Sequence, residues 1–349
     1  MNGHGPEAGH IAFVVPLLAS APCRLYAGQG LAPQYAPEWK PKSAQFKPAQ
    51  CCAAVVGGLE RRNDVADISG RFVWYELMTT EVAVARTFYA EVVGWAAQDA
   101  STSDLAYTVL ASGKAPVSGL MELPPAARKM GATPRWMAYV GVGDVKAMAE
   151  RIVRLGGTVY VPPTDTNIGR IAVVADPQMA TLGLVEGLKA GQQQLAEMGK
   201  VGRVGWHELL AADRTKAFAF YNEVFGWQKV NAEIGPTNKY QLFSAAGQTI
   251  GGIFTKRREE LVSFWLYYIN VDDVDAALER VKAAGGSIFE GPMELSGEIW
   301  IARCRDPQGA AFALQGKRGP ASEVGWSVEW GNFSSRGRLQ VSKPPRRSD

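Results

Sequence analysis

The apolar residues between positions 206 and 227 follow two different periods, one after the other. The first few positions alternate between polar and apolar residues, which is typical of a strand. Asp213 then provides a helix N-cap, and the segment ends at a Gly-Trp pair that would stop a helix. Between these points, apolar residues recur at helical spacing, so the segment predicts a strand followed by an amphipathic helix. The apolar helix positions are Ala217, Phe218, Phe220, Tyr221 and Phe225.

The same segment occurs earlier in the chain, from Trp74 to Trp95. Three pairs of aromatic residues are separated by 132 positions: Trp74 and Trp206, Tyr89 and Tyr221, and Trp95 and Trp227. Further pairs follow at offsets of 129 to 133, and they include Trp136 with Trp265 and the two Asp-Pro-Gln segments that begin at Asp176 and Asp306. The chain therefore contains a duplication, with one domain at residues 71–187, a linker at 188–202 and a second domain at 203–316.

Each domain is itself predicted to consist of two halves of the same order. In the first domain, strand 72–78 and helix 81–93 precede strands 95–100, 106–111 and 117–122. The second half repeats this order with strand 136–142, helix 145–155 and strands 158–161, 170–175 and 181–186, and the second domain reads alike. We predict an α+β protein of two tandem domains, each made of two βαβββ modules with curved mixed sheets and the helices outside.

The ends of the chain differ from the repeats. Residues 1–70 hold seven of the 20 prolines and show no sustained period, so we expect disorder there. Since the next methionine after Met1 is Met78, a start at another codon, such as that of Val65, is an alternative that would make residues 1–70 spurious. Residues 317–349 are expected to form a flexible basic tail.

Composition narrows the class of function. The net charge of +3 is modest for 349 residues, so neither a nucleic acid nor an anionic membrane is expected as a partner. The apolar run at 11–21 is broken by Pro16 and is too short to span a bilayer. Four cysteines without a CxxC pair favour a reducing compartment, and we expect a cytoplasmic protein.

The motifs resemble those of one superfamily. Both domains carry FY-x-x-V-F/V-G-W after the first helix, V-x-D-V before the second helix, and D-P-Q after it. In this order and in duplicate, over residues 71–316, the motifs are similar to those of the vicinal oxygen chelate superfamily. That superfamily contains glyoxalases, extradiol dioxygenases and bleomycin- and fosfomycin-resistance proteins. The resemblance implies glyoxalase-like domains that pack as a pseudo-dimer, so that the chain is a monomer of that kind or a homodimer.

The resemblance also implies where a metal would be bound in relatives that use one. The ligand positions correspond to Trp74, Met137, Gly183 and Glu122 in the first domain, and to Trp206, Leu266, Ala313 and Thr255 in the second. Only Glu122 has a side chain that divalent metals favour, and one carboxylate does not make a metal site. We therefore expect no metal and no other cofactor, with a divalent metal at unusual residues as the alternative.

Two glutamates are the candidates for acid–base chemistry. Glu76 and Glu208 lie two residues beyond Trp74 and Trp206, and alternation along a strand places each on the same face as its tryptophan. Each carboxylate could act as a base, bind a cationic ligand or accept structural hydrogen bonds. His207 should point to the opposite face, beneath the helix. A shift of one residue in register would reverse these faces and make His207 the candidate.

Aromatic and amide side chains could line the same faces and bind a ligand. Such duplicated aromatics would either pack a core or line a pocket on which a ligand stacks. The candidate ligand-binding residues are Trp74, Tyr107, Tyr139, Trp206, Tyr240, Tyr268 and Gln315.

Two functions of different classes remain open. The first is a protein that binds a small, aromatic or drug-like molecule in a cleft without the usual metal ligands, as the superfamily's resistance proteins do. The alternative is a glyoxalase- or lyase-type enzyme that uses Glu76 or Glu208 as its base, with or without a metal at unusual residues.

Overall fold

The computed structural model describes residues 68–103, 105–129, 131–166, 169–188, 198–231, 240–256, 262–295 and 298–319. The expected disorder of residues 1–70 and the flexible tail from 317 concern segments that lie almost entirely outside these ranges. The centre of the predicted linker lies outside them as well. Within the described residues, no helix is long and apolar enough to cross a membrane.

Both domains are built from the predicted elements. Domain 1 comprises β1 (Phe72–Thr79), α1 (Val82–Val93), β2 (Ala96–Asp99), β3 (Thr108–Ser112), β4 (Ala115–Glu122), α2 (Pro125–Lys129), β5 (Arg135–Gly141), α3 (Val145–Arg154), β6 (Thr158–Thr166), β7 (Gly169–Ala175) and β8 (Thr181–Glu186). Domain 2 comprises β9 (Val204–Ala211), α5 (Arg214–Phe225), β10 (Gln228–Val230), β11 (Tyr240–Ala245), β12 (Gln248–Thr255), β13 (Phe264–Asp273), α6 (Val274–Ala283), β14 (Ser287–Glu294), β15 (Trp300–Arg305) and β16 (Ala311–Lys317).

The short helix α2 was not predicted. Pro125, the second of two consecutive prolines, is the first residue of this helix. Proline is favoured at that position because its missing N–H would have no partner within the helix anyway.

Each domain forms one mixed sheet of eight strands. The strand order is β2-β3-β4-β1-β5-β8-β7-β6 in domain 1, and the equivalent strands of domain 2 have the same order. At the centre of each sheet, the first strands of the two modules pair antiparallel, and each of them pairs in parallel with the last strand of its own module. The predicted α+β fold of two tandem βαβββ domains is thereby confirmed.

The helix boundaries follow from capping. Asp144, Asp213 and Asp273 each accept a hydrogen bond from the backbone N–H three residues later, as N-caps do. Helix α5 ends at Gly226, whose φ of 71° is in the left-handed region that favours glycine. The predicted core positions of α5 are buried or half-buried, and Phe220 and Tyr221 are its fully packed aromatics.

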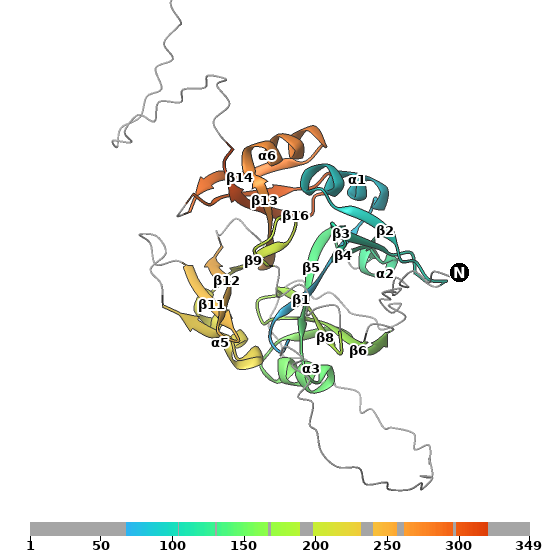
Figure 1. Ribbon diagram of the computed structural model, residues 1–349. Coiled ribbons are helices and arrows are strands. Elements are labelled where there is room, and N and C mark those ends of the chain that lie inside the picture. The colour runs from blue at the N-terminus through green and yellow to red at the C-terminus, as the bar shows by residue number, and fades with distance from the viewer. Residues whose placement is uncertain are drawn as a thin grey trace, which may run out of the picture.

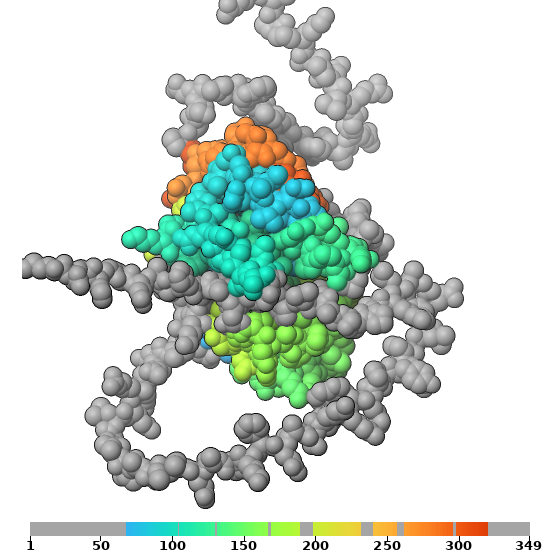
Figure 2. Space-filling view, turned by 90° about the vertical axis from the view of Figure 1, so that its right-hand side faces the viewer, coloured from blue at the N-terminus to red at the C-terminus, as the bar shows by residue number. Residues whose placement is uncertain are grey.

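The helix-covered faces of the two sheets pack against each other. One continuous apolar core contains residues from both domains, and at its centre Phe72 of β1 stacks on His207 of β9 with ring centroids 4.0 Å apart. Helix α1 lies beside α6, and α3 lies beside α5, on opposite sides of this core (Figure 1). In the space-filling view, the blue and teal residues of the first module meet the orange residues of the α6 module directly (Figure 2).

Equivalent residues make equivalent contacts across the domain interface. The indole N–H of Trp95 donates to the carbonyl of Gly202 at 2.8 Å, and that of Trp227 donates to the carbonyl of Gly70 at 2.6 Å. Since both pairs are related by the 132-residue offset, the two domains pack about an approximate twofold axis.

The two Asp-Pro-Gln segments also join the domains. Asp176 and Asp306 accept hydrogen bonds within their turns, as expected of turn residues. In addition, Tyr221 donates to Asp176 at 3.0 Å, and Tyr89 donates to Asp306 at 3.3 Å, each from the opposite domain. Burial raises the pKa of both carboxyl groups. The repeated Asp-Pro-Gln segments thus form equivalent parts of the domain interface.

Candidate functional site

The face of each sheet that lies opposite the helices of the described residues, here called the concave face, carries the candidate residues. In domain 1, Tyr107 donates to Glu76 Oε1 at 3.0 Å and Tyr139 donates to Oε2 at 2.9 Å. The indole N–H of Trp74 donates to the Tyr107 hydroxyl at 3.2 Å. The four side chains that the sequence assigned to this face therefore form one hydrogen-bonded network around a carboxyl group.

This network is closed to solvent. Glu76 and Trp74 are each 2% exposed, and Tyr139 is 3% exposed. The tyrosine rings lie directly over glycines. A Cβ added to Gly119 would be 1.6 Å from the Tyr107 hydroxyl, and one added to Gly183 would be 2.2 Å from the Tyr139 ring, so each ring occupies the space that a side chain would need. Together with neighbouring apolar side chains, the aromatic residues of this face form a buried cluster that is separate from the core shared by the two domains.

Burial changes the acid–base properties of this network. Burial raises the pKa of Glu76 from 4.5 to about 7, although the hydrogen bonds from Tyr139 and Tyr107 act in the opposite direction. Burial, reinforced by the neighbouring charge of Glu76, raises the pKa of Tyr107 and of Tyr139 as well. No cation forms an ion pair with Glu76 among the described residues. Its carboxyl group can therefore gain or lose a proton near neutral pH.

Domain 2 holds its glutamate in a different way. Arg303 of β15 forms an ion pair with Glu208, with Nη2 and Oε2 2.6 Å apart, and a second ion pair with Glu290 of β14. Its Nε donates to the Tyr268 hydroxyl at 3.1 Å, and Tyr268 donates to Glu208 at 2.7 Å. Burial favours the neutral guanidine, but the charge of Glu208, together with Tyr268 and Glu290, raises the pKa of Arg303 above its ordinary value. Glu208 is thus the carboxylate of a buried ion pair.

Domain 2 also leaves its aromatics closer to solvent. Trp206 and Tyr240 are half-buried, and the indole N–H of Trp206 donates to the Tyr240 hydroxyl at 2.9 Å. Among the residues that the structure describes, the apolar cluster on this face has five buried members, whereas its counterpart in domain 1 has ten. Within that part of the chain, domain 2 therefore has the smaller buried cluster on its concave face.

Gln315 lies farther along the same face, near the linker end of β9. Its side chain donates to Asn270 Oδ1 at 2.7 Å, and Asn270 in turn binds the carbonyls of Met198 and Lys200. Among the described residues, no hydrogen bond joins Gln315 to the Glu208 network, so its contacts are those of a residue that fixes the linker.

Sequence reasoning missed Arg303 and Glu290. The repeat offset aligns Arg303 with Val173 and Glu290 with Val161, and the pairing agrees, because Val161 opposes Val173 as Glu290 opposes Arg303. An apolar pair in one domain is thus an ion pair in the other. A position-by-position comparison of the two repeats reveals this difference between the domains. It does not show which other side chains Arg303 and Glu290 contact.

His207 lies on the helix-covered face, opposite to Trp206 and Glu208. Its Nδ1 is 2.7 Å from the carbonyl of Ile250, so this nitrogen carries the proton, and Nε2 accepts from the Tyr75 hydroxyl at 2.6 Å. Burial lowers the pKa of His207 to about 4. The neutral ring is a structural part of the domain interface.

The positions at which the resemblance implies metal ligands do not fit a metal in domain 1. Trp74 and Met137 are packed in the concave face of domain 1, and the Tyr139 ring covers Gly183. Glu122 is exposed and binds Arg128 at 2.7 Å. Nowhere in the described part of the chain do three or more His, Cys, Asp or Glu side chains come together as a metal site.

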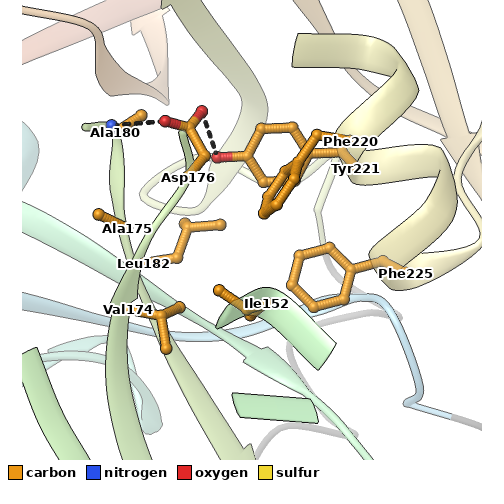
Figure 3. Close-up of a pocket in the computed structure, with 9 residues that line it drawn as sticks. All are labelled: Ile152, Val174, Ala175, Asp176, Ala180, Leu182, Phe220, Tyr221 and Phe225. Carbon is orange, nitrogen blue, oxygen red and sulfur yellow. Dashed lines mark hydrogen bonds between the residues drawn. The ribbon is translucent and has the colours of Figure 1, made fainter. Parts of the chain in front are cut away.

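A cavity also lies between the domains, away from both concave faces. It is lined by residues of α3, β7, β8 and α5, and the hydrogen bond between Tyr221 and Asp176 crosses one end of it (Figure 3). Its volume of about 10 Å³ is close to the smallest that holds one water molecule, so it is no site for a larger ligand.

Comparisons with known proteins agree with this architecture. The model of the Glyoxalase/Bleomycin resistance protein/Dioxygenase superfamily matches residues 71–184 and 203–314. The chain is 30% identical over 244 residues to "Putative glyoxylase CFP32" of Mycobacterium bovis, which covers 69% of this chain and 92% of that protein. It is 33% identical over 129 residues to "Anthracycline biosynthesis protein DnrV" of Streptomyces peucetius, which covers 37% of this chain and 46% of that protein.

Solved structures are similar in fold. The Mn(II)-bound glyoxalase from Novosphingobium aromaticivorans superposes with a TM-score of 0.51 at 14% identity, over 72% of this chain and 83% of that chain. The 2,3-dioxygenase LapB from Pseudomonas sp. KL28 gives a TM-score of 0.50 at 11% identity, over 71% of this chain and 92% of that chain. At these identities the likeness concerns the fold alone.

Proposed function

The chain belongs to the Glyoxalase/Bleomycin resistance protein/Dioxygenase superfamily, and we propose that it binds a small aromatic molecule on the concave face of domain 2. The observation that carries this proposal is the difference between the two domains. Domain 1 buries its aromatics around a single carboxyl group, whereas domain 2 keeps Trp206 and Tyr240 half-buried beside charged groups. A large aromatic plate next to a few fixed polar groups is what ligand sites typically present.

The binding role is proposed to require no metal at the superfamily's usual positions. In domain 2 these positions are Trp206, Leu266, Ala313 and Thr255. Three of them offer no ligand atom that a divalent metal favours. Metal analysis of the purified protein after dialysis tests this point. A stoichiometric divalent metal that survives dialysis would contradict it.

A relative's name supports an aromatic ligand. The name of the Streptomyces peucetius relative assigns that protein to anthracycline biosynthesis, and we propose the same class of molecule, a planar fused-ring aromatic, as the ligand of this chain. Stacking on Trp206 would suit such a ring.

Calorimetric titration of the full chain with tricyclic aromatic probes, such as acridone, tests the binding function. We expect one probe to bind per chain, and Trp206→Ala to weaken binding about tenfold or more because the stacking surface is lost. Tyr160→Ala is the matched control, since Tyr160 is an aromatic residue of domain 1 that is 38% exposed. If no probe binds, or if Trp206→Ala binds as well as the unaltered protein, the proposal is wrong.

One observation favours an enzymatic alternative. The raised pKa of Glu76, about 7, is suited to proton transfer at neutral pH, and the Mycobacterium relative is named a glyoxylase. Under this alternative Glu76 acts as the base, while Glu208, paired with Arg303, serves binding. Turnover of glutathione conjugates of 2-oxoaldehydes, with a rate that rises through pH 7 and is lost in Glu76→Gln, would support it. Unchanged turnover in Glu76→Gln would exclude Glu76 as the base.

A further inference from the structure

We infer that the ligand of the domain 2 face carries an aliphatic chain, and that the β14–β15 hairpin binds this chain through Met293, Leu295 and Ile299. These three side chains are here called the hairpin patch. The inference rests on the proposed binding function and names the class of ligand: a planar aromatic molecule with an aliphatic substituent. It is supported by the position of the hairpin patch, by its exposure, and by its polar counterpart in domain 1.

The hairpin patch lies on the concave face of domain 2. Met293 pairs across the hairpin with Ile301, which is a buried member of the apolar cluster on that face. Beyond this pair, the backbone N–H of Leu295 donates to the carbonyl of Ile299 at 2.9 Å and continues the pairing toward the tip. Side chains two residues apart along a strand point to the same face, so Leu295 follows Met293 and Ile299 follows Ile301.

The hairpin patch is exposed although it is apolar. Leu295 is 55% exposed, Ile299 is 37% exposed and Met293 is half-buried. Exposed apolar side chains that lie together beside a binding face commonly mark a surface for a ligand or a partner. Contact with an aliphatic group would remove this surface from water, which is favourable and needs no polar group on the ligand.

The hairpin patch is continuous with the Trp206 part of the face. Met293 and Trp206 both pack against one buried apolar cluster. Between β9, which carries Trp206, and β15 lie the strands β13 and β16. Three strand spacings, about 14 Å along the sheet, therefore separate β9 from β15. A chain of eight carbons on a tricycle can span this distance. The buried members of the cluster are Leu210, Leu266, Tyr268, Ile301 and Ala313.

The charged residue between Trp206 and the hairpin extends away from this path. Arg303 lies on β15 and its guanidinium reaches Glu208, which pairs with Leu266 on one side of the Arg303 row. Ile301 pairs with Gln315 on the opposite side of that row, toward the hairpin patch. An aliphatic chain that runs toward Ile301 would thus leave the ion pair between Arg303 and Glu208 in place.

Domain 1 has two threonines and a glycine at the equivalent positions. Its β6–β7 hairpin has Thr164, Thr166 and Gly169 in place of the three residues of the hairpin patch. The register agrees, because Thr164 pairs with an isoleucine of β7 as Met293 pairs with an isoleucine of β15. The apolar tip is therefore a feature of domain 2, and a preference for an aliphatic chain should belong to that domain.

Acridones with alkyl chains of different length on the ring nitrogen test the inference. We expect calorimetry on the full chain to give 10-octylacridone an affinity about tenfold or more above that of 10-methylacridone, because each buried methylene strengthens binding. Leu295→Thr combined with Ile299→Thr should reduce this gain to about threefold or less, while 10-methylacridone binds as before. Val153→Thr is the matched control and should keep the full gain, since Val153 is 53% exposed on α3 of domain 1.

The outcomes separate the inference from the proposed function. Equal affinities for the two probes, or a full gain in the double variant, would overturn the inference while leaving aromatic binding intact. If neither probe binds at about 1 mM, the proposed function fails and the inference fails with it. If the double variant does not fold, Leu295→Thr alone gives the same test, because Leu295 is the most exposed residue of the hairpin patch.

Sedimentation of the unaltered protein tests another occupant of the hairpin patch. We expect the same association state in the unaltered protein and in the double variant. A dimer that dissociates in the double variant would show that a second copy of the chain covers the hairpin patch, and would overturn the inference.

Discussion

Replacement of Glu76 by glutamine should stabilise the protein at pH 8. Glu76 is buried, receives hydrogen bonds from two tyrosines, and has no cationic partner among the described residues. A glutamine has the shape of the protonated carboxyl group, with one oxygen to accept and one NH₂ group to donate, so it can take the place of the neutral acid. The variant removes the charge and keeps most of the packing.

The size of the effect follows from the shift in pKa. Burial raises the pKa of Glu76 from 4.5 in the unfolded chain to about 7 in the folded one. Between these values the folded state binds more protons than the unfolded state, so the free energy of unfolding falls as pH rises. Below pH 4.5 the group is protonated in both states and has no effect. Above pH 7 the carboxyl group is ionised in both states, and the difference between its two pKa values corresponds to a destabilisation of the folded state by about 3 kcal/mol.

Urea denaturation at pH 5 and at pH 8 measures the effect. Relative to the unaltered protein, Glu76→Gln should gain about 2.5 kcal/mol on going from pH 5 to pH 8, since a small part of the effect is already present at pH 5. Glu208→Gln is the matched control, because it removes the equivalent carboxylate from an ion pair with Arg303. That variant should lose about 3 kcal/mol at pH 8. If Glu76→Gln is destabilised at pH 8, or responds to pH as the unaltered protein does, the reasoning about Glu76 is wrong.

Three further predictions concern the interface and the closed face of domain 1. Because burial lowers the pKa of His207 from 6.5 to about 4, its contribution to stability is present above pH 6.5 and falls by about 3 kcal/mol toward pH 4. His207→Gln should lack this loss in urea midpoints at pH 7 and pH 4.5, and an equal loss in both proteins would contradict the assignment. Tyr221→Phe and Tyr89→Phe should each lower the free energy of unfolding by about 1 to 2 kcal/mol, since a buried aspartate and an indole lose their partner. A loss in only one of the two variants would argue against the approximate twofold packing. Gly119→Ala should cost about 2 kcal/mol by displacing Tyr107, whereas Gly143→Ala, with open space around it, should be neutral in the same thermal melts. Equal melting temperatures would show that the Tyr107 ring does not need Gly119.

Much of the fold can be predicted from the sequence because the duplication presents the same pattern of strands and helices twice. The caps Asp144, Asp213 and Asp273 act locally, so a local pattern identifies them. The two-residue alternation of strands assigns Trp206 and Glu208 to one face and His207 to the other, and the structure has them there. These features need no knowledge of distant residues.

Apart from the short helix α2, the features that escaped prediction depend on distant partners. Whether Glu208 meets a cation depends on Arg303, 95 residues later, and on a side chain that spans two strands. Whether Asp176 is more than a turn residue depends on Tyr221 of the other domain. Whether the concave face of domain 1 is closed to solvent depends on how the Tyr107 and Tyr139 rings pack over glycines. Residue spacing does not encode such side-chain packing.

A crystal structure of the full chain with bound acridone tests the proposed binding function most directly. We predict a single tricycle against the Trp206 ring on the concave face of domain 2. A probe bound in domain 1 or between the helices, with the domain 2 face unchanged, would contradict the claim.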